Sequence, residues 1–162
     1  AAWASAAEGG TPNGATAPGG ELDAALRAAG GEGMTLAVVD APPHAAPAAG
    51  QIARRSELVL IPVRPSAFDL AAVPAAVEIV AAAKVRGAFV LSACPFRAPE
   101  IAETRAALEG YGLPVFPGEI TDRRAFARAV TSGSAVTEFE AEGKAAEEVR
   151  ALWDWIKDAL KR

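Results

Sequence analysis

The chain alternates short, uninterrupted apolar runs with longer stretches whose apolar residues recur every three or four positions. The runs at 36–39, 58–63, 87–93 and 113–116 show no polar alternation, which is typical of parallel strands buried on both faces. Turn residues separate them from the helical stretches. Strands that alternate with helices predict parallel β–α–β units with right-handed crossovers. We therefore expect an α/β fold with a parallel sheet and helices on both faces.

Six helices are predicted, over 21–29, 45–55, 66–84, 99–110, 122–131 and 145–160. Ser66 and Asp69 form a Ser-x-x-Asp variant of the capping box at the start of the third helix, and Pro74 predicts a kink or a fresh start within it. The helix at 122–131 and the last helix each carry an apolar stripe, which predicts that both pack inward. The stripes are Ala125, Phe126, Ala129 and Val130, and Ala145, Val149, Leu152, Ile156 and Leu160.

Composition limits the class of protein. With 162 residues, 51% hydrophobic and 22% charged, the chain fits one globular domain, with a Gly/Pro/Thr/Ala-rich flexible loop at 8–20. A net charge of −4 argues against a broad surface for nucleic acid. The single cysteine, Cys94, forms no internal disulfide and reads as a small core residue. Without a long apolar run or a signal-peptide pattern, the sequence predicts a cytoplasmic protein with no membrane partner.

Asp40 is the strongest candidate for chemistry. It follows the apolar run 36–39, and Pro42 and Pro43 follow it closely. In open α/β sheets, ligands bind at the carboxyl ends of the strands, and one carboxylate there suits the water shell of Mg²⁺. An aspartate after a strand is also a common helix cap or turn residue, and spacing alone favours that reading.

Four segments together resemble the ParA/MinD family of deviant-Walker P-loop ATPases. Residues 35–44 resemble its Walker B and switch segment, and 58–70, with Pro-Ser-x-x-Asp, resemble its next strand and turn. Residues 119–129 and 145–152 resemble its closing helices. The resemblance covers most of the chain from about Gly33 onward. It implies that 1–162 is a single, partial ParA-like domain with a three-layer P-loop NTPase fold, best matched over 33–162.

The phosphate loop of that family has no counterpart in the sequence. The loop is a Gly-rich turn with two lysines, whereas Lys84 is the only lysine before Gly110 and follows no such turn. The opening residues Ala1–Ser5 resemble what comes after the family's second strand. We therefore expect an N-terminally truncated domain. Because the phosphate-binding lysine is absent, we expect this chain alone neither to bind ATP tightly nor to hydrolyse it.

The resemblance also implies roles for particular residues. Asp40 would be the catalytic and magnesium-side acid, and Pro42 and Pro43 the switch that senses the γ-phosphate of ATP. Ser92 stands near the place of an adenine-reading asparagine, and Pro117 and Glu119 lie in the second adenine-side loop. Plain turns and strand-to-helix connections are the alternative reading of the same residues.

Partners follow from the resemblance as well. It implies an ATP-dependent homodimer, a centromere-binding partner that stimulates hydrolysis, and non-specific DNA contacted by basic residues on late helices. Arg123, Arg124 and Arg128 fit that description by their helical spacing. The alternative is a solvated helix face paired with Glu119 and Asp122.

Two other functions stay open. The chain is alternatively a non-catalytic α/β interaction module that has lost the loop and retains a partner-binding surface. A third reading is a MinD-like membrane-site ATPase. Aromatic and basic residues near the end of the chain suggest an amphipathic helix for a lipid surface, namely Trp153, Trp155, Lys157, Lys161 and Arg162. Packing of that helix against the sheet explains its apolar stripe better.

Overall fold

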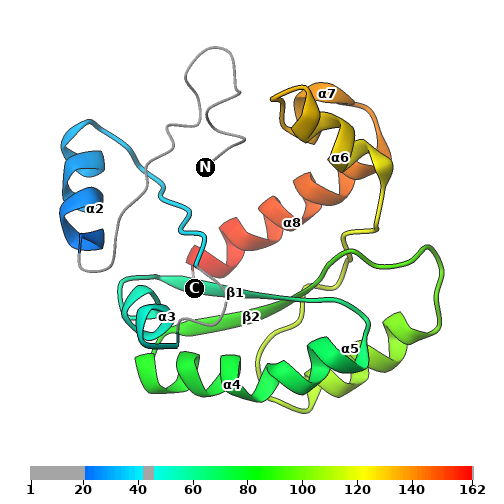
Figure 1. Cartoon of the computed structure of the whole chain (residues 1–162), viewed down its shortest axis with the longest axis horizontal. Helices are drawn as coiled ribbons and strands as arrows, with labels where there is room; N and C mark the ends of the chain where they lie inside the picture. Colours follow the sequence, from blue (N-terminus) through cyan, green and yellow to red (C-terminus); the bar gives the residue numbers. More distant parts are fainter. Residues whose placement is uncertain (1–20, 42–45, 162) are drawn as a thin grey trace.

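The computed structural model describes residues 21–41 and 46–161, and shows two parallel strands with helices around them (Figure 1). The loop predicted at 8–20 and the switch residues Pro42 and Pro43 lie outside the described residues. In chain order the elements are α2 (Leu22–Gly31), α3 (Ala46–Ala53), β1 (Leu58–Val63), α4 (Ala67–Ala83), β2 (Arg86–Leu91), α5 (Glu100–Glu109), α6 (Arg124–Thr131), α7 (Val136–Phe139) and α8 (Lys144–Lys161). The α/β class predicted from the sequence is confirmed.

The sheet is built on β1 and β2, which pair in parallel from Leu58 opposite Arg86 to Val63 opposite Leu91. A single β–α–β unit connects them, with α4 as the crossover helix. Two of the predicted strands, 58–63 and 87–93, correspond to these strands, although β2 ends two residues earlier than predicted. Parallel pairing brings the carboxyl ends of both strands to the same edge.

The strand predicted at 113–116 is reduced to one bridge beside β2. Phe89 donates its backbone N–H to the carbonyl of Pro114 at 2.8 Å, and Phe116 donates to the carbonyl of Phe89 at 2.9 Å. Val115 therefore sits opposite Phe89 in a parallel bridge. Pro114 has no N–H to donate toward β2, so the ladder does not extend to the residues before this bridge.

Helices cover the two faces of the strands. Ile61, Val63, Phe89 and Leu91 point to the face that carries α4 and α5, where they form the main core with Val73, Val80, Ile101 and Leu108. On the other face, Arg86 donates to the carbonyl of Ala159 in α8, and the rings of Phe116 and Trp155 lie 5.6 Å apart. Figure 1 shows α8 on one side of the strands and α4 and α5 on the other.

The start of α4 confirms the predicted cap. Ser66 is the N-cap, and its hydroxyl accepts the backbone N–H of Asp69 at 3.1 Å. The carboxylate of Asp69 in turn accepts the hydroxyl of Ser66 and the backbone N–H of Arg64. The fresh start predicted at Pro74 is wrong, because α4 continues through that residue as one helix. One missing N–H does not outweigh the packing of Val73 and Val80 in the core.

The strand predicted at 36–39 is not formed. Residues 34–41 have no helix or strand assignment and pair with no strand in the part of the chain that is described. Leu36, Val38 and Val39 are 52%, 87% and 39% exposed. The prediction of a strand there is wrong, because a strand also needs the backbone of a neighbour, which a local apolar pattern does not supply.

The last three helices form a second, smaller core. Ala129 of α6, Val136 of α7 and Ala145 of α8 are buried together, with Ala125 and Phe126 packed on them. The short helix α7 was not predicted, and Val130, which was predicted inward, is 56% exposed. The stripe of α8 is turned inward as expected. Over the described ranges, no helix combines the length and apolarity needed to cross a membrane.

Candidate functional site

At the carboxyl edge of the sheet, the loops that follow β1 and β2 lie next to each other. Ser92, directly after β2, donates its backbone N–H to the carbonyl of Val63, the last residue of β1, at 3.0 Å. The two strands therefore end side by side. The chain continues from β1 into Arg64–Ser66 and from β2 into Ser92–Pro99. This edge is where ligands bind in open parallel sheets.

A third segment, 117–122, runs along the loop that follows β2. Ile120 donates to the carbonyl of Leu91 at 2.9 Å, and Cys94 donates to the carbonyl of Ile120 at 3.0 Å. Thr121 then forms a parallel bridge with Cys94. Of the residues predicted on the adenine side, Ser92, Pro117 and Glu119 thus lie on two segments that the backbone holds together.

Backbone strain marks the loop after β2. Ala93 and Arg97 have φ values of 49° and 56°, in the left-handed region that residues with a Cβ rarely adopt. Between them, Phe96 is 69% exposed, and the guanidinium of Arg97 lies 4.9 Å from its ring centroid. Such residues cost about 1–3 kcal/mol each and cluster at functional sites, so the strain makes this edge a candidate site.

A groove of about 440 Å³ lies beside this loop along α5. Arg105 holds one wall of the groove in place. Its guanidinium donates to the carbonyls of Phe116 at 2.6 Å and Gly118 at 2.9 Å, and it lies 4.0 Å from the carboxylate of Glu119. Sequence reasoning missed Arg105, whose only signal was one arginine in an alanine-rich helix. The groove is lined by Arg97, Ala98, Ile101, Ala102, Arg105, Ala106, Glu109 and Glu119.

Cys94 is completely buried between these segments. Burial raises the pKa of its thiol to about 11, and the negative charge of Glu119 adds to the effect. Because only the thiolate is a good nucleophile or metal ligand, Cys94 is chemically inert here. Its role is packing, as the sequence suggested.

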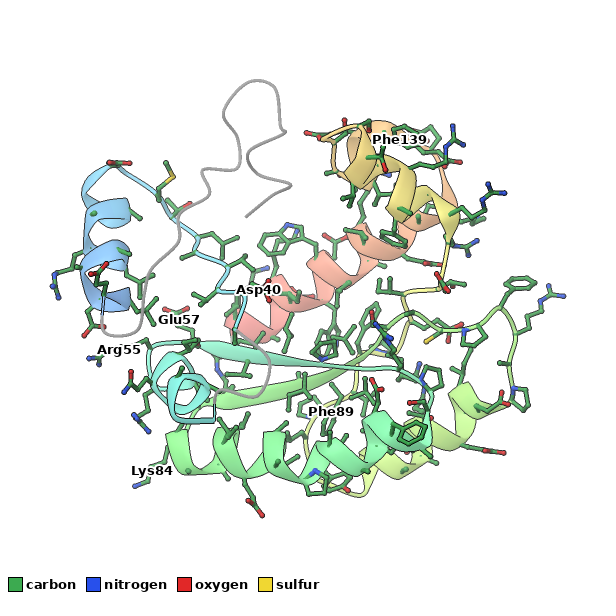
Figure 2. All side chains as sticks on the ribbon, in the orientation of Figure 1. Asp40, Arg55, Glu57, Lys84, Phe89 and Phe139 are labelled. Carbon is green, nitrogen blue, oxygen red and sulfur yellow. The ribbon has the colours of Figure 1, made fainter. Side chains whose placement is uncertain are left out.

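Asp40 does not join this edge. It is exposed, and it ends the extended segment that pairs with no described strand. Figure 2 shows Asp40 apart from the carboxyl ends of β1 and β2, toward the side where Glu57 leads into β1. It lines neither of the two grooves described for this chain. Its magnesium role remains a prediction from resemblance.

The described residues do not form a phosphate or metal site by themselves. Within 21–41 and 46–161, no three His, Cys, Asp or Glu side chains are arranged to hold a metal ion. No lysine follows a Gly-rich turn anywhere in the sequence. The residues present therefore do not fit a tightly bound magnesium nucleotide without additional groups.

The three arginines near α6 divide into two kinds. Arg123 forms an ion pair with Glu148 of α8, with Nη2–Oε1 at 2.7 Å and Nε–Oε1 at 3.1 Å. Glu148 also accepts the backbone N–H and hydroxyl of Thr121. Burial disfavours ionisation of Glu148, but the hydrogen bonds from Arg123 and Thr121 prevail and hold the pKa of this carboxyl below its ordinary value. Arg123 therefore already has an acidic partner, and this ion pair fixes α8 to the segment before α6.

Arg124 and Arg128, by contrast, line a groove where a ligand could contact them. They lie one turn apart on α6 and line a second groove of about 460 Å³ with Ala127, Thr131, Ser132 and Phe139. The guanidinium of Arg128 stacks 5.3 Å from the ring centroid of Phe139. Among the described residues, no carboxylate forms an ion pair with either, so the pairing predicted with Glu119 and Asp122 is wrong.

Comparison with known proteins adds no relative. No protein-family model matches the chain, and no curated protein matches it.

Proposed function

We propose that the chain is part of a ParA-like partition ATPase, without the phosphate loop of that family. The observation that carries the proposal is the arrangement at the carboxyl edge, where the strained loop after β2 and segment 117–122 are bonded together. These are the two segments that the resemblance assigns to adenine. A fold of the three-layer P-loop NTPase type is part of the proposal.

In this proposal the nucleotide side contains six residues. Ser92, Pro117 and Glu119 approach adenine, Asp40 approaches the magnesium ion, and Pro42 and Pro43 form the switch. The arrangement of Ser92 beside 117–122 supports the adenine side. ATP and Mg²⁺ bind only once a phosphate loop is supplied, because neutralising the phosphate charge is most of what such a site does.

The DNA side of the proposal rests on Arg124 and Arg128. Both are without an acidic partner in the described part of the chain and line one groove, as phosphate-contacting arginines do. Arg123 positions α8 and contributes indirectly. Non-specific DNA would bind the homodimer, and a centromere-binding protein would stimulate its hydrolysis.

The proposal is tested first by reading the codons upstream of Ala1. An in-frame stretch of the Lys-Gly-Gly-x-Gly-Lys-Thr type supports it, and its absence counts against it. The longer product, if encoded, is expected to bind ATP in calorimetry, with affinity lost on Asp40→Asn. The 162-residue chain is the matched control and is expected to show no micromolar binding.

The alternative, a non-catalytic α/β interaction module, is favoured by a separate observation. Met34, Leu36, Val38 and Val39 expose apolar side chains in a row, which is typical of a segment that contacts another surface. Such a module would need no nucleotide. Absence of the loop upstream, together with unchanged partner binding in Asp40→Asn, would favour it over the ATPase.

A further inference from the structure

We propose that the groove on α6 holds an unpaired nucleobase, so that the chain binds single-stranded DNA more tightly than duplex DNA. The inference rests on the proposed function, because it takes DNA as the ligand of this groove. It goes further in naming the form of DNA that the groove fits.

The groove offers two arginines to a phosphate backbone. Arg124 and Arg128 are exposed and line it from consecutive turns of α6. Within the described part of the chain neither forms an ion pair, whereas the neighbouring Arg123 is paired with Glu148. Guanidinium groups without an acidic partner suit the negatively charged oxygens of phosphate.

An aromatic ring backs one of these arginines. The guanidinium of Arg128 lies 5.3 Å from the ring centroid of Phe139, and Phe139 packs on the small core of Ala129, Val136 and Ala145. Phe139 therefore supports the guanidinium from the protein side. Because Arg128 is exposed, the side of the guanidinium turned away from the ring is open to the groove. Unpaired bases stack on aromatic rings and on guanidinium planes.

The size of the groove suits one nucleotide. Its volume of about 460 Å³ lies in the range of roughly 300–1,000 Å³ of pockets that hold small ligands. Ala127, which also lines it, contributes only a methyl group and leaves room for a planar base. Figure 2 shows Phe139 well apart from β1 and β2, so this site is separate from the strands.

Charge alone would favour duplex DNA. The duplex has the higher density of phosphates, and contacts to phosphate need no aromatic support. In a duplex, however, the faces of the bases are covered by the neighbouring bases. The pair of Arg128 and Phe139 then has no base to stack on, so this feature of the groove fits a single strand.

Acidic residues near the groove also favour a flexible ligand. Glu138 and Glu140 flank Phe139 in the sequence, Glu142 follows, and all three are exposed. Their carboxylates repel the phosphates that a rigid duplex would bring close to them. A single strand can turn away from them after about one or two nucleotides, because its backbone is flexible.

Fluorescence anisotropy with the 162-residue chain at low salt tests the inference, since the groove lies within one chain. The three labelled probes have equal length: an oligo-deoxythymidine strand, an abasic strand with the same phosphates, and a duplex. We expect the thymidine strand to bind roughly fivefold or more tightly than the abasic strand, because a stacked base is lost in the latter. It should also bind more tightly than the duplex.

Two variants identify the stack. Arg128→Lys keeps the positive charge but removes the planar guanidinium, and Arg128 is exposed, so the core is not disturbed. Phe139→Leu keeps an apolar side chain beside the small core but removes the ring. Each should reduce the ratio of the two single-strand affinities to about one. Phe68→Leu removes a 90% exposed ring on α4 and is the matched control, which should retain the preference.

Each outcome decides the inference. Equal affinity for the thymidine and abasic strands, tighter binding of the duplex, or an unchanged preference in Arg128→Lys would overturn it. Absence of binding to all three probes would overturn it as well. The proposed function is decided separately, by the ATP test of the longer product, because Arg128 and Phe139 lie outside its nucleotide side.

Discussion

Glu148 and Thr121, although 27 residues apart, are joined twice: the carboxylate accepts the backbone N–H of Thr121 at 3.0 Å and its hydroxyl at 2.8 Å. Since Arg123 donates to the same carboxylate, one side chain of α8 holds the segment that lines the carboxyl edge. The small core around α6 and α7 is thereby connected to the sheet.

Replacing Glu148 is expected to weaken the fold. Glu148→Ala leaves the Thr121 hydroxyl and the Arg123 guanidinium without their acceptor, at a cost of about 2–3 kcal/mol in the free energy of unfolding. Urea denaturation measures the change. The matched control is Glu147→Ala, which removes an exposed ion pair with Lys144 worth at most about 0.5 kcal/mol. Equal effects of the two substitutions would contradict this role.

The same carboxylate makes stability depend on pH. The pKa of Glu148 is lower in the folded chain than its ordinary value of 4.5, so its contribution is fully present above pH 4.5. This contribution to the free energy of unfolding is lost as the pH falls through the lowered pKa that Glu148 has in the folded chain. The pKa of Asp23 is also lowered, by Arg55, so the informative comparison is with Glu148→Gln. We expect the urea midpoint to fall less steeply below pH 4.5 in that variant.

Cys94 is expected to resist thiol reagents in the folded protein. Its side chain is buried and its pKa is raised to about 11, so little thiolate exists at pH 8. Reaction with Ellman's reagent should occur only after denaturation. Ser92→Cys, at the partly exposed neighbouring position, is the control and should react in the folded state. Rapid labelling of Cys94 would show that the edge opens.

Gly87 is expected to tolerate no side chain. A Cβ there would lie 2.7 Å from Cγ1 of Val80, where α4 packs on β2. Gly87→Ala should therefore lower the unfolding free energy by about 1–3 kcal/mol. Gly31→Ala is the control, since a Cβ there meets nothing within 4 Å and the helix favours alanine. A neutral Gly87→Ala would mean that the α4–β2 contact is looser than described.

The arginine pair of α6 is expected to account for any DNA binding. Replacing Arg124 and Arg128 with alanine should reduce the slope of log affinity against log salt by about 2, because each phosphate contact contributes roughly 0.9. Fluorescence anisotropy with a random duplex at several salt concentrations measures it, in the dimeric longer product. Arg27→Ala with Arg54→Ala removes the same charge elsewhere and should leave the slope unchanged.

Local sequence signals predicted the parts of the fold that local interactions determine. The bounds of β1 and the Ser66 cap were correct because a continuous apolar run and a side-chain cap are encoded within a few residues. The strand at 36–39 failed because strand pairing depends on a neighbour. Helix α7 was missed because four residues carry too little periodicity to be recognised.

The candidate site was predictable only in part. Ser92 and Glu119 were identified by resemblance, and the structure brings their segments together. Arg105 and Glu148 were missed because each acts across the fold, on a loop far from it in sequence. The apolar run before Asp40 placed that residue at a strand end, but its distance from a cleft depends on whether that strand pairs.

Pro117, which follows the bridge at Val115, has a consequence for association. Intermolecular β-structure grows when the outer strand of one molecule offers consecutive backbone N–H groups to the next. Because Phe116 directs its N–H to β2, the next N–H along the chain would face outward, and Pro117 lacks it. That margin of the molecule is thus protected against fibril-like stacking, and concentrated samples should not elongate from it.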